Sequence, residues 1–224
     1  MKFCNTVTLE CVDSTNEYIK SLPVYSCVRA LAQTAGRGRL GRSFISPAGG
    51  LYFSVKIPNP CLRSLVTEAA AVAVASCIPG SGIKWPNDII LHGKKVCGIL
   101  CASNSENMDI IIGVGINVAC TPIEGSACTG GSADELFNRV ICALEHTLTL
   151  TEEGKREELL GLYRPLLLTS GIPVTVTSCG KSISGTAKGV DDDGALLVLC
   201  GGELYHISSG EATLSKPADG MHGR

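Results

Sequence analysis

Hydrophobic and polar positions in the first third of the chain predict three strands and two helices. Weak alternation over residues 5–11 and 26–32 suits two strands, and the apolar run Leu51–Ile57 suits a third. Between the first two strands, Asp13-Ser14-Thr15-Asn16 offers several side chains that cap a helix start. Leu65–Ile78 is rich in alanine without a polar face, so we expect a helix buried against a sheet.

The middle of the chain predicts a hairpin, a glycine-broken strand and two more helices. Ile89–Leu91 and Val96–Ser103 flank a His-Gly pair, which is a hairpin signal, and a strongly apolar strand follows over Asp109–Val118. A capping box that begins at Ser132 opens a helix with apolar residues at four-residue spacing. A second helix is expected near Thr151–Arg164, where the following proline stops it.

From about Gly171 the pattern changes to short strands joined by glycine turns. The predicted strands are Pro173–Ser178, Ser182–Val190, Ala195–Cys200 and Glu203–Ile207. Their even spacing is typical of a small antiparallel barrel. We therefore divide the chain into a domain over residues 1–168, a second domain over residues 169–216 and a disordered tail over residues 217–224.

Composition limits the class of protein. Hydrophobic residues make up 45% of the 224 residues and charged residues 18%, as in an ordinary globular protein. The net charge of −2 gives no global reason to bind nucleic acid. The start of the chain contains no apolar core of signal-peptide length, and the longest apolar runs are too short to cross a bilayer. We expect a cytoplasmic protein without a nucleic-acid or membrane partner.

Twelve cysteines invite a search for disulfides or zinc, but their spacing argues against both. The chain has no Cys-x-x-Cys pair, and no histidine stands at ligand spacing from a cysteine. Cys97 and Cys101 share one face of a predicted strand, and Cys142 and Cys200 lie in apolar segments. We interpret these residues as buried free thiols in a reducing compartment.

Two polar segments carry the candidate chemistry. Gly36–Arg42 holds three arginines and three glycines in seven residues, which suits a loop that surrounds an anion with guanidinium groups and backbone N–H groups. Lys84–Asp88 places a lysine, an asparagine and an aspartate around a proline turn. Alone, the arginine-rich loop fits a solvated basic turn equally well. Together, the two segments indicate a site for a phosphorylated small molecule.

These segments and several others resemble, in order and spacing, the biotin–protein ligases, specifically the short form without an N-terminal DNA-binding domain. The matching segments are Asp13–Asn16, Gln33–Arg42, Ser46-Pro47, Leu51–Ser54, Lys84–Asp88, Lys95–Leu100, Gly113–Asn117, Gly194–Leu197 and Gly210-Glu211. The resemblance implies an α/β (α+β) fold in which a central mixed sheet with flanking helices, of the class II aminoacyl-tRNA synthetase type, precedes a C-terminal SH3-like β-barrel. It also implies an ATP-dependent enzyme that forms biotinyl-5′-AMP and transfers biotin to a lysine of a biotin carboxyl carrier protein.

The resemblance assigns site residues by position. Lys95 and Arg39 are the implied catalytic residues, and Asp88 is the implied Mg²⁺ ligand. The implied biotin-binding residues are Ser14, Thr15, Asn16, Gln33, Gly36, Arg37, Gly38, Arg39, Lys95, Gly98, Gly113 and Gly115. The implied nucleotide-binding residues are Arg37, Arg39, Arg42, Asn87, Asp88 and Asn117. Lys94 is the natural comparison for Lys95, because neighbouring strand residues point to opposite faces.

Two departures from the family pattern and three alternatives stay open. Phe44 stands where the family often has tryptophan, and the loop Thr121–Gly131 has no aromatic residue to stack on adenine. A lipoate–protein ligase-like acyltransferase would share the architecture. A biotin-responsive regulator needs a DNA-binding domain, for which there is no room before Asp13. A non-catalytic relic is disfavoured by the retained Arg39 and Lys95. The sequence leaves a homodimer open.

Overall fold

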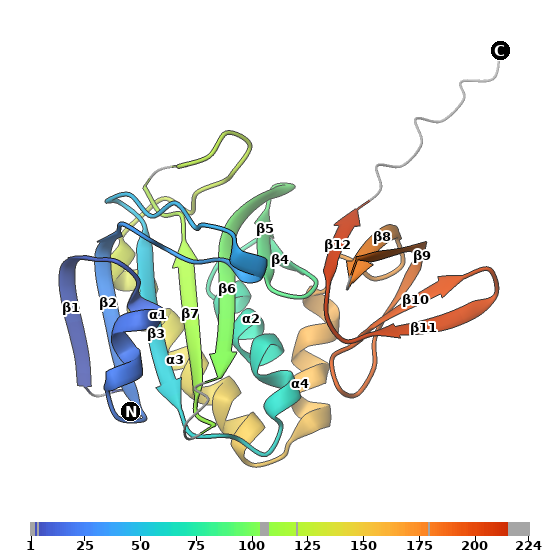
Figure 1. Cartoon of the computed structure of the whole chain (residues 1–224), viewed down its shortest axis with the longest axis horizontal. Helices are drawn as coiled ribbons and strands as arrows, with labels where there is room; N and C mark the ends of the chain where they lie inside the picture. The colour runs from blue at the N-terminus through green and yellow to red at the C-terminus, as the bar shows by residue number, and fades with distance from the viewer. Residues whose placement is uncertain (1–2, 4, 104–107, 120, 179, 215–224) are drawn as a thin grey trace.

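The computed structural model describes residue 3 and residues 5–103, 108–119, 121–178 and 180–214, which fold around two β-sheets (Figure 1). The larger sheet has seven strands in the order β1-β2-β3-β7-β6-β5-β4. Its strands are β1 (Asn5–Val12), β2 (Ser26–Gln33), β3 (Leu51–Ile57), β4 (Ser81–Lys84), β5 (Asp88–Leu91), β6 (Lys94–Ser103) and β7 (Ile110–Ile116). β1 pairs with β2 in parallel and the other pairs are antiparallel, so the predicted mixed sheet is confirmed.

Helices cover both faces of this sheet. On one face lie α2 (Val66–Ser76), α3 (Ala133–Glu152) and α4 (Arg156–Tyr163), and on the other lies the short α1 (Thr15–Tyr18) with the 3₁₀ turn that follows it (Figure 1). Every residue of the central strand β3 is buried as a result. The alanines of α2 let its backbone approach the sheet closely, which explains why a helix without a polar face is stable here.

The predicted start of the helix after α3 is wrong. The capping box is confirmed, because the Ser132 side chain accepts a hydrogen bond from the Glu135 backbone. Residues 151 and 152, however, belong to α3, and α4 begins only at Arg156. Gly154 ends α3 in the left-handed conformation, and the Lys155 N–H reaches back to the Leu150 carbonyl, 2.9 Å away. This is a Schellman motif, which needs glycine at the turn.

The C-terminal sheet is antiparallel and has five strands in the order β11-β10-β9-β8-β12. Its strands are β8 (Pro173–Ser178), β9 (Lys181–Val190), β10 (Leu196–Cys200), β11 (Glu203–Ile207) and β12 (Glu211–Leu214). The four predicted strands are present, and the predicted small β-domain is confirmed. Sequence reasoning missed β12 and, in the larger sheet, β4, which are both only four residues long. The predicted disordered tail lies outside the described residues.

Only some of the cysteines in the described residues are buried. The nine cysteines in the described ranges are all free, and Cys27, Cys77 and Cys97 are buried. Burial raises the pKa of the Cys27 and Cys101 thiols to about 12. Cys142 is exposed, contrary to the prediction, because it lies on the outward face of α3. Within the described part of the chain, no helix is both long and apolar enough to cross a membrane.

Candidate functional site

One cleft of about 120 Å³ collects most of the predicted site residues. It lies between the arginine-rich loop, the first turn of α1, strands β5, β6 and β7, and the start of β12. The predicted residues that line it are Ser14, Thr15, Asn16, Gln33, Arg37, Gly38, Arg39, Arg42, Asn87, Asp88, Lys95, Gly98, Gly113 and Gly115. The topology thus brings segments from both sheets to one place.

One end of the cleft, which we call the polar end, carries a hydrogen-bond network of Thr15, Asn16 and Gln33 with Ser54, a buried residue that does not itself line the cleft. The Thr15 N–H and hydroxyl group both donate to Gln33 Oε1, at 2.9 and 3.1 Å. The Ser54 hydroxyl lies 2.7 Å from Thr15 Oγ1 and 2.5 Å from Asn16 Oδ1. Ser14 occupies the N-cap position of α1, but its side chain makes no capping hydrogen bond. These neutral groups are therefore fixed before any ligand arrives.

Three predicted glycines leave room for neighbouring side chains. A Cβ atom at Gly113 would lie 2.1 Å from Asn16 Oδ1, so only glycine admits this amide group. A Cβ atom at Gly115 would lie 2.5 Å from the Phe44 ring, and one at Gly98 would lie 3.2 Å from the same ring. These glycines allow Asn16 and Phe44 to lie directly against the floor of the cleft.

At the other end, which we call the cationic end, four basic side chains each have an oxygen acceptor. The pairs are Arg37 with Glu17 (2.7 Å), Arg39 with the Asn87 amide oxygen (3.1 Å), Arg42 with Glu211, and Lys95 with Asp88 (2.6 Å). The side chains of Arg37, Arg42 and Lys95 are 59%, 57% and 44% exposed. Exposed ion pairs are weak, so these cations can exchange their partners for ligand oxygens.

Lys95 and Lys94 differ as the alternation of a strand requires. Both side chains are exposed, but Lys95 lines the cleft and Lys94 does not. Asp88, which holds Lys95, is the carboxylate that sits among the polar groups of the proline turn. The described residues contain no cluster of three or more groups that could hold a metal ion unaided.

Gly36 and Asn117 lie outside this cleft. A Cβ atom at Gly36 would lie 2.4 Å from the Phe44 carbonyl oxygen, so this glycine serves the close approach of two loop strands. The Asn117 side chain donates to the Ala127 carbonyl at 3.0 Å, and its Oδ1 atom is buried without a hydrogen-bond partner in the described structure. A ligand role for these two residues stays a prediction.

Several residues of the site were given no role in it from the sequence. Ser54 could have been found as a small polar residue in a mostly apolar strand. Glu17 and Glu211, the partners of Arg37 and Arg42, give no local signal, because Glu211 lies 169 residues from Arg42. Trp85 is buried, as a core residue should be, but it also lines the cleft.

Comparison with protein families matches both parts of the chain. Residues 8–117 match the biotin/lipoate A/B protein ligase family, and residues 169–215 match the biotin protein ligase C-terminal domain. The chain is 34% identical to a biotin–[acetyl-CoA-carboxylase] ligase of Paracoccus denitrificans, over 83% of this chain and 90% of that protein. It is 30% identical to the bifunctional ligase/repressor BirA of Salmonella typhimurium, over 94% and 74% of the two chains.

A solved structure agrees with these relatives. The biotin protein ligase of Aquifex aeolicus in complex with biotin and ATP superposes with a TM-score of 0.84 at 28% identity, covering 96% of this chain and 100% of that one. These matches place the chain among the ATP-dependent ligases that activate an acyl group. The chain belongs to the biotin–protein ligase family, which confirms the predicted family and fold.

Proposed function

We propose that the protein activates biotin with ATP in this cleft and transfers it to a lysine of a biotin carboxyl carrier protein. Membership of the family supports ATP-dependent biotin ligation, and the roles of single residues are our proposal. The observation that carries it is that one cleft is lined both by neutral polar side chains and by basic side chains. Biotin has a neutral ureido ring and a carboxylate, so it matches both ends.

In the first step, a biotin carboxylate oxygen attacks the α-phosphorus of ATP. A new O–P bond forms, the bond to the bridging oxygen breaks, and pyrophosphate leaves with the electron pair. Arg39 and Lys95 offset the charge that builds up on the phosphoryl oxygens, which is the largest contribution a protein makes to such a reaction. The polar end holds the ureido ring, whose N–H and C=O groups must be matched when they are buried.

In the second step, the carrier lysine attacks the acyl carbon of biotinyl-5′-AMP as a free amine. The C–N bond forms, the bond to the AMP oxygen breaks, and the amine proton passes to solvent. Until then the acyl-adenylate must be kept from water. The glycines of the arginine-rich loop give it the freedom to close over the intermediate.

The site could hold Mg²⁺ bound together with the phosphates of the nucleotide. Mg²⁺ is usually bound by one or two carboxylates together with substrate phosphates, and Asp88 supplies one carboxylate beside Lys95. We propose that Asp88 contacts the ion when ATP is present, where the ion neutralises phosphate charge. Arg37, Arg42, Asn87 and Asn117 are the further nucleotide residues that we propose.

The partner and the compartment are also proposals. The acceptor is a carrier domain of acetyl-CoA carboxylase or a related enzyme, since the relative from Paracoccus denitrificans carries that activity in its name. Free, buried thiols favour the reducing cytoplasm. A homodimer and the lack of a nucleic-acid partner stay predictions.

The test is transfer to a purified carrier domain with ATP, Mg²⁺ and biotin, read by mass spectrometry. We expect the carrier to gain one biotinyl group, with AMP released from the acyl-adenylate. A carrier with its acceptor lysine changed to arginine is the control and should stay unmodified. No gain of mass with biotin, or gain of a lipoyl group in place of biotin when lipoate is supplied together with it, would contradict the proposal.

A further inference from the structure

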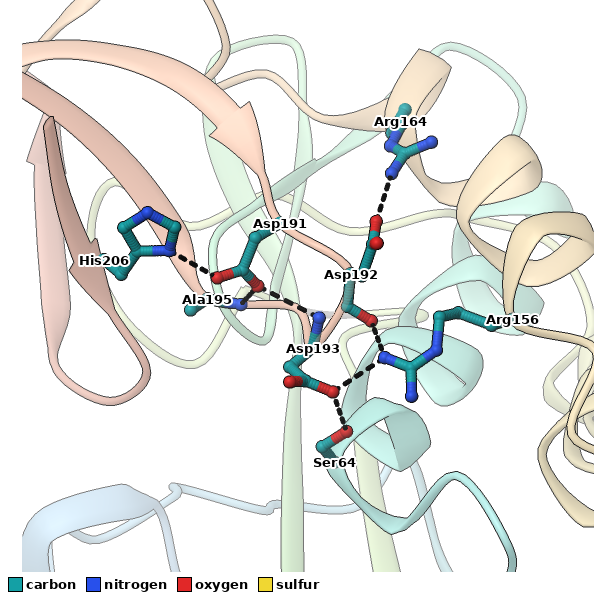
Figure 2. Close-up of polar contacts among 8 residues, drawn as sticks. All are labelled: Ser64, Arg156, Arg164, Asp191, Asp192, Asp193, Ala195 and His206. Carbon is teal, nitrogen blue, oxygen red and sulfur yellow. Dashed lines mark hydrogen bonds and ion pairs between the residues drawn. The ribbon is translucent and has the colours of Figure 1, made fainter.

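The turn Asp191–Gly194 of the C-terminal sheet is fastened to the larger domain beside the cleft (Figure 2). Arg156 of α4 donates to the Asp192 carbonyl and, at 2.7 Å, to the Asp193 carboxylate. Arg164 lies 3.4 Å from the Asp192 carboxylate. Two arginines from the helical layer therefore hold one turn of the other sheet.

The turn also has a fixed shape of its own. The Asp191 carboxylate accepts hydrogen bonds from the backbone N–H groups of Asp193 (3.0 Å) and Ala195 (2.9 Å). Its other oxygen lies 2.7 Å from His206 Nδ1 on β11, as Figure 2 shows. A turn that is braced internally presents its last carbonyl group, that of Gly194, in one direction.

That carbonyl group binds Trp85, a residue that lines the cleft. The Trp85 indole N–H donates to the Gly194 oxygen at 3.0 Å in a buried environment. Gly194 has φ +81°, and a Cβ atom on it would lie 2.7 Å from Glu68 Oε1 and 3.1 Å from Leu65. Only glycine permits both the left-handed conformation and this close packing on α2.

Glu68 connects the same contact to Arg39. Its side chain is 4% exposed, and its Oε2 atom has no hydrogen-bond partner within the described ranges. Burial raises the pKa of the Glu68 carboxyl to about 8, and the Arg39 charge lowers it by less. Glu68, Trp85, Gly194 and Arg39 line one cavity of about 180 Å³, which adjoins the cleft through Arg39 and Asn87.

We propose that Gly194 and Trp85 are positioning residues for the nucleotide in the activation step, and that Glu68 is the side chain against which Gly194 packs. The turn fixes Trp85, and Trp85 fixes the proline turn that carries Asn87 and, through it, Arg39. This inference rests on the proposed function. If these contacts were only packing between the two sheets, breaking them would lower the stability of the whole protein and would weaken ATP and biotin binding alike.

The test compares Gly194→Ala with Gly202→Ala. Gly202 lies in the β10–β11 turn with φ +88°, and a Cβ atom there would meet nothing within 4 Å, so this control carries the same backbone strain without the contact. We expect Gly194→Ala to raise the KM for ATP in biotin-dependent pyrophosphate exchange by ~10-fold, the scale of a small misplacement of the reacting groups. The Kd for biotin without nucleotide should change by less than about 2-fold.

A double variant and the fluorescence of Trp85 test why Gly194→Ala would lose ATP affinity. Glu68→Ala removes the carboxyl that the new methyl group would strike, so it should restore ~3-fold or more of the lost ATP affinity when combined with Gly194→Ala. Trp85 is the chain's only tryptophan, so its emission reports on the contact without turnover. We expect a red shift in Gly194→Ala at unchanged far-ultraviolet circular dichroism, and none in Gly202→Ala.

Each outcome decides something. Equal losses of ATP and biotin affinity, or the same effect in both glycine variants, would overturn the inference and leave the ligase intact. Unchanged Trp85 emission in Gly194→Ala would overturn it as well. A wild-type protein without biotin-dependent exchange would overturn the proposed function, whereas the emission comparison would still decide whether the turn holds Trp85.

Discussion

The two ends of the cleft are built in opposite ways. At the polar end, Thr15 is hydrogen-bonded to both Gln33 and Ser54, and Thr15 and Ser54 are buried. At the cationic end, Arg37, Arg42 and Lys95 lie at the surface and pair with carboxylates. A buried network is costly to break, whereas an exposed ion pair contributes at most about 1 kcal/mol.

The difference suggests a division of labour. A neutral ring is recognised best by groups that are already aligned, because no ordering has to accompany binding. A polyphosphate is bound well by cations that can move, since its charge shifts during the reaction. The carboxylates at the cationic end hold the arginines near the cleft until the nucleotide replaces them. Changing one end should therefore spare the ligand of the other.

The largest effect should come from Lys95→Ala, which removes a cation from the activation step. We expect formation of biotinyl-5′-AMP to slow by ~100-fold, the loss that follows removal of one preorganised electrostatic contact. Rapid-quench measurement of pyrophosphate release checks this. Lys94→Ala is the matched control and should behave as the wild type. Normal pyrophosphate release in Lys95→Ala would remove Lys95 from the mechanism.

Glu68→Gln should change how stability depends on pH. The pKa of Glu68 rises from 4.5 to about 8 on folding because the carboxyl is buried. The folded state therefore keeps a proton that the unfolded state loses, and wild-type stability falls as pH rises through this window by about 1.4 kcal/mol per pH unit. Glutamine cannot ionise. In urea unfolding from pH 5 to 9, the free energy of unfolding of the variant relative to the wild type should increase up to pH ~8 and then stay level. A difference in free energy that is the same at every pH would contradict this.

Ser54→Ala tests whether a change at the polar end weakens biotin binding and spares ATP binding. The change leaves Thr15 and Asn16 without a shared partner, and an unsatisfied buried group costs about 1–3 kcal/mol. We expect biotin affinity to fall by ~10-fold with the KM for ATP nearly unchanged. Calorimetry and pyrophosphate exchange measure the two quantities. Ser26→Ala changes a buried serine of β2 outside the cleft and should leave both as they are. A larger loss for ATP than for biotin would count against the division of labour.

Glu211→Gln should have the smallest effect. It weakens the exposed ion pair between β12 and Arg42. We expect the KM for ATP to change by less than ~3-fold at low salt, and the difference to vanish at high salt because the charges are screened. A steady-state series over sodium chloride concentration is sufficient. A loss above tenfold that persists in salt would mean that Glu211 contacts a ligand.

Local patterns in the sequence predicted most elements of the fold. Alternation located β1 and β2, apolar runs located β3 and β7, and the Ser132 capping box located the start of α3. The end of α3 was misplaced because Gly154 was not read as a helix terminator. Strands of four residues, such as β4, are too short for periodicity to be measured.

The predicted site residues came together because their motifs lie on adjacent strands or on the loops beside them. What the sequence could not supply are the contacts between distant segments. Asn16 fills the space above Gly113, and the Trp85 indole binds the Gly194 carbonyl, 109 residues away. Such pairs depend on how distant segments pack together. The sequence around one partner does not indicate which residue it will contact.

The most direct test is to titrate the purified protein with biotin, and separately with lipoate, with and without ATP and Mg²⁺, and to identify the bound product by mass spectrometry. We predict that biotin binds without nucleotide, that ATP adds the heat of a reaction, and that the product has the mass of biotinyl-5′-AMP. Binding of lipoate in place of biotin, or biotin binding that never yields the adenylate, would contradict the account.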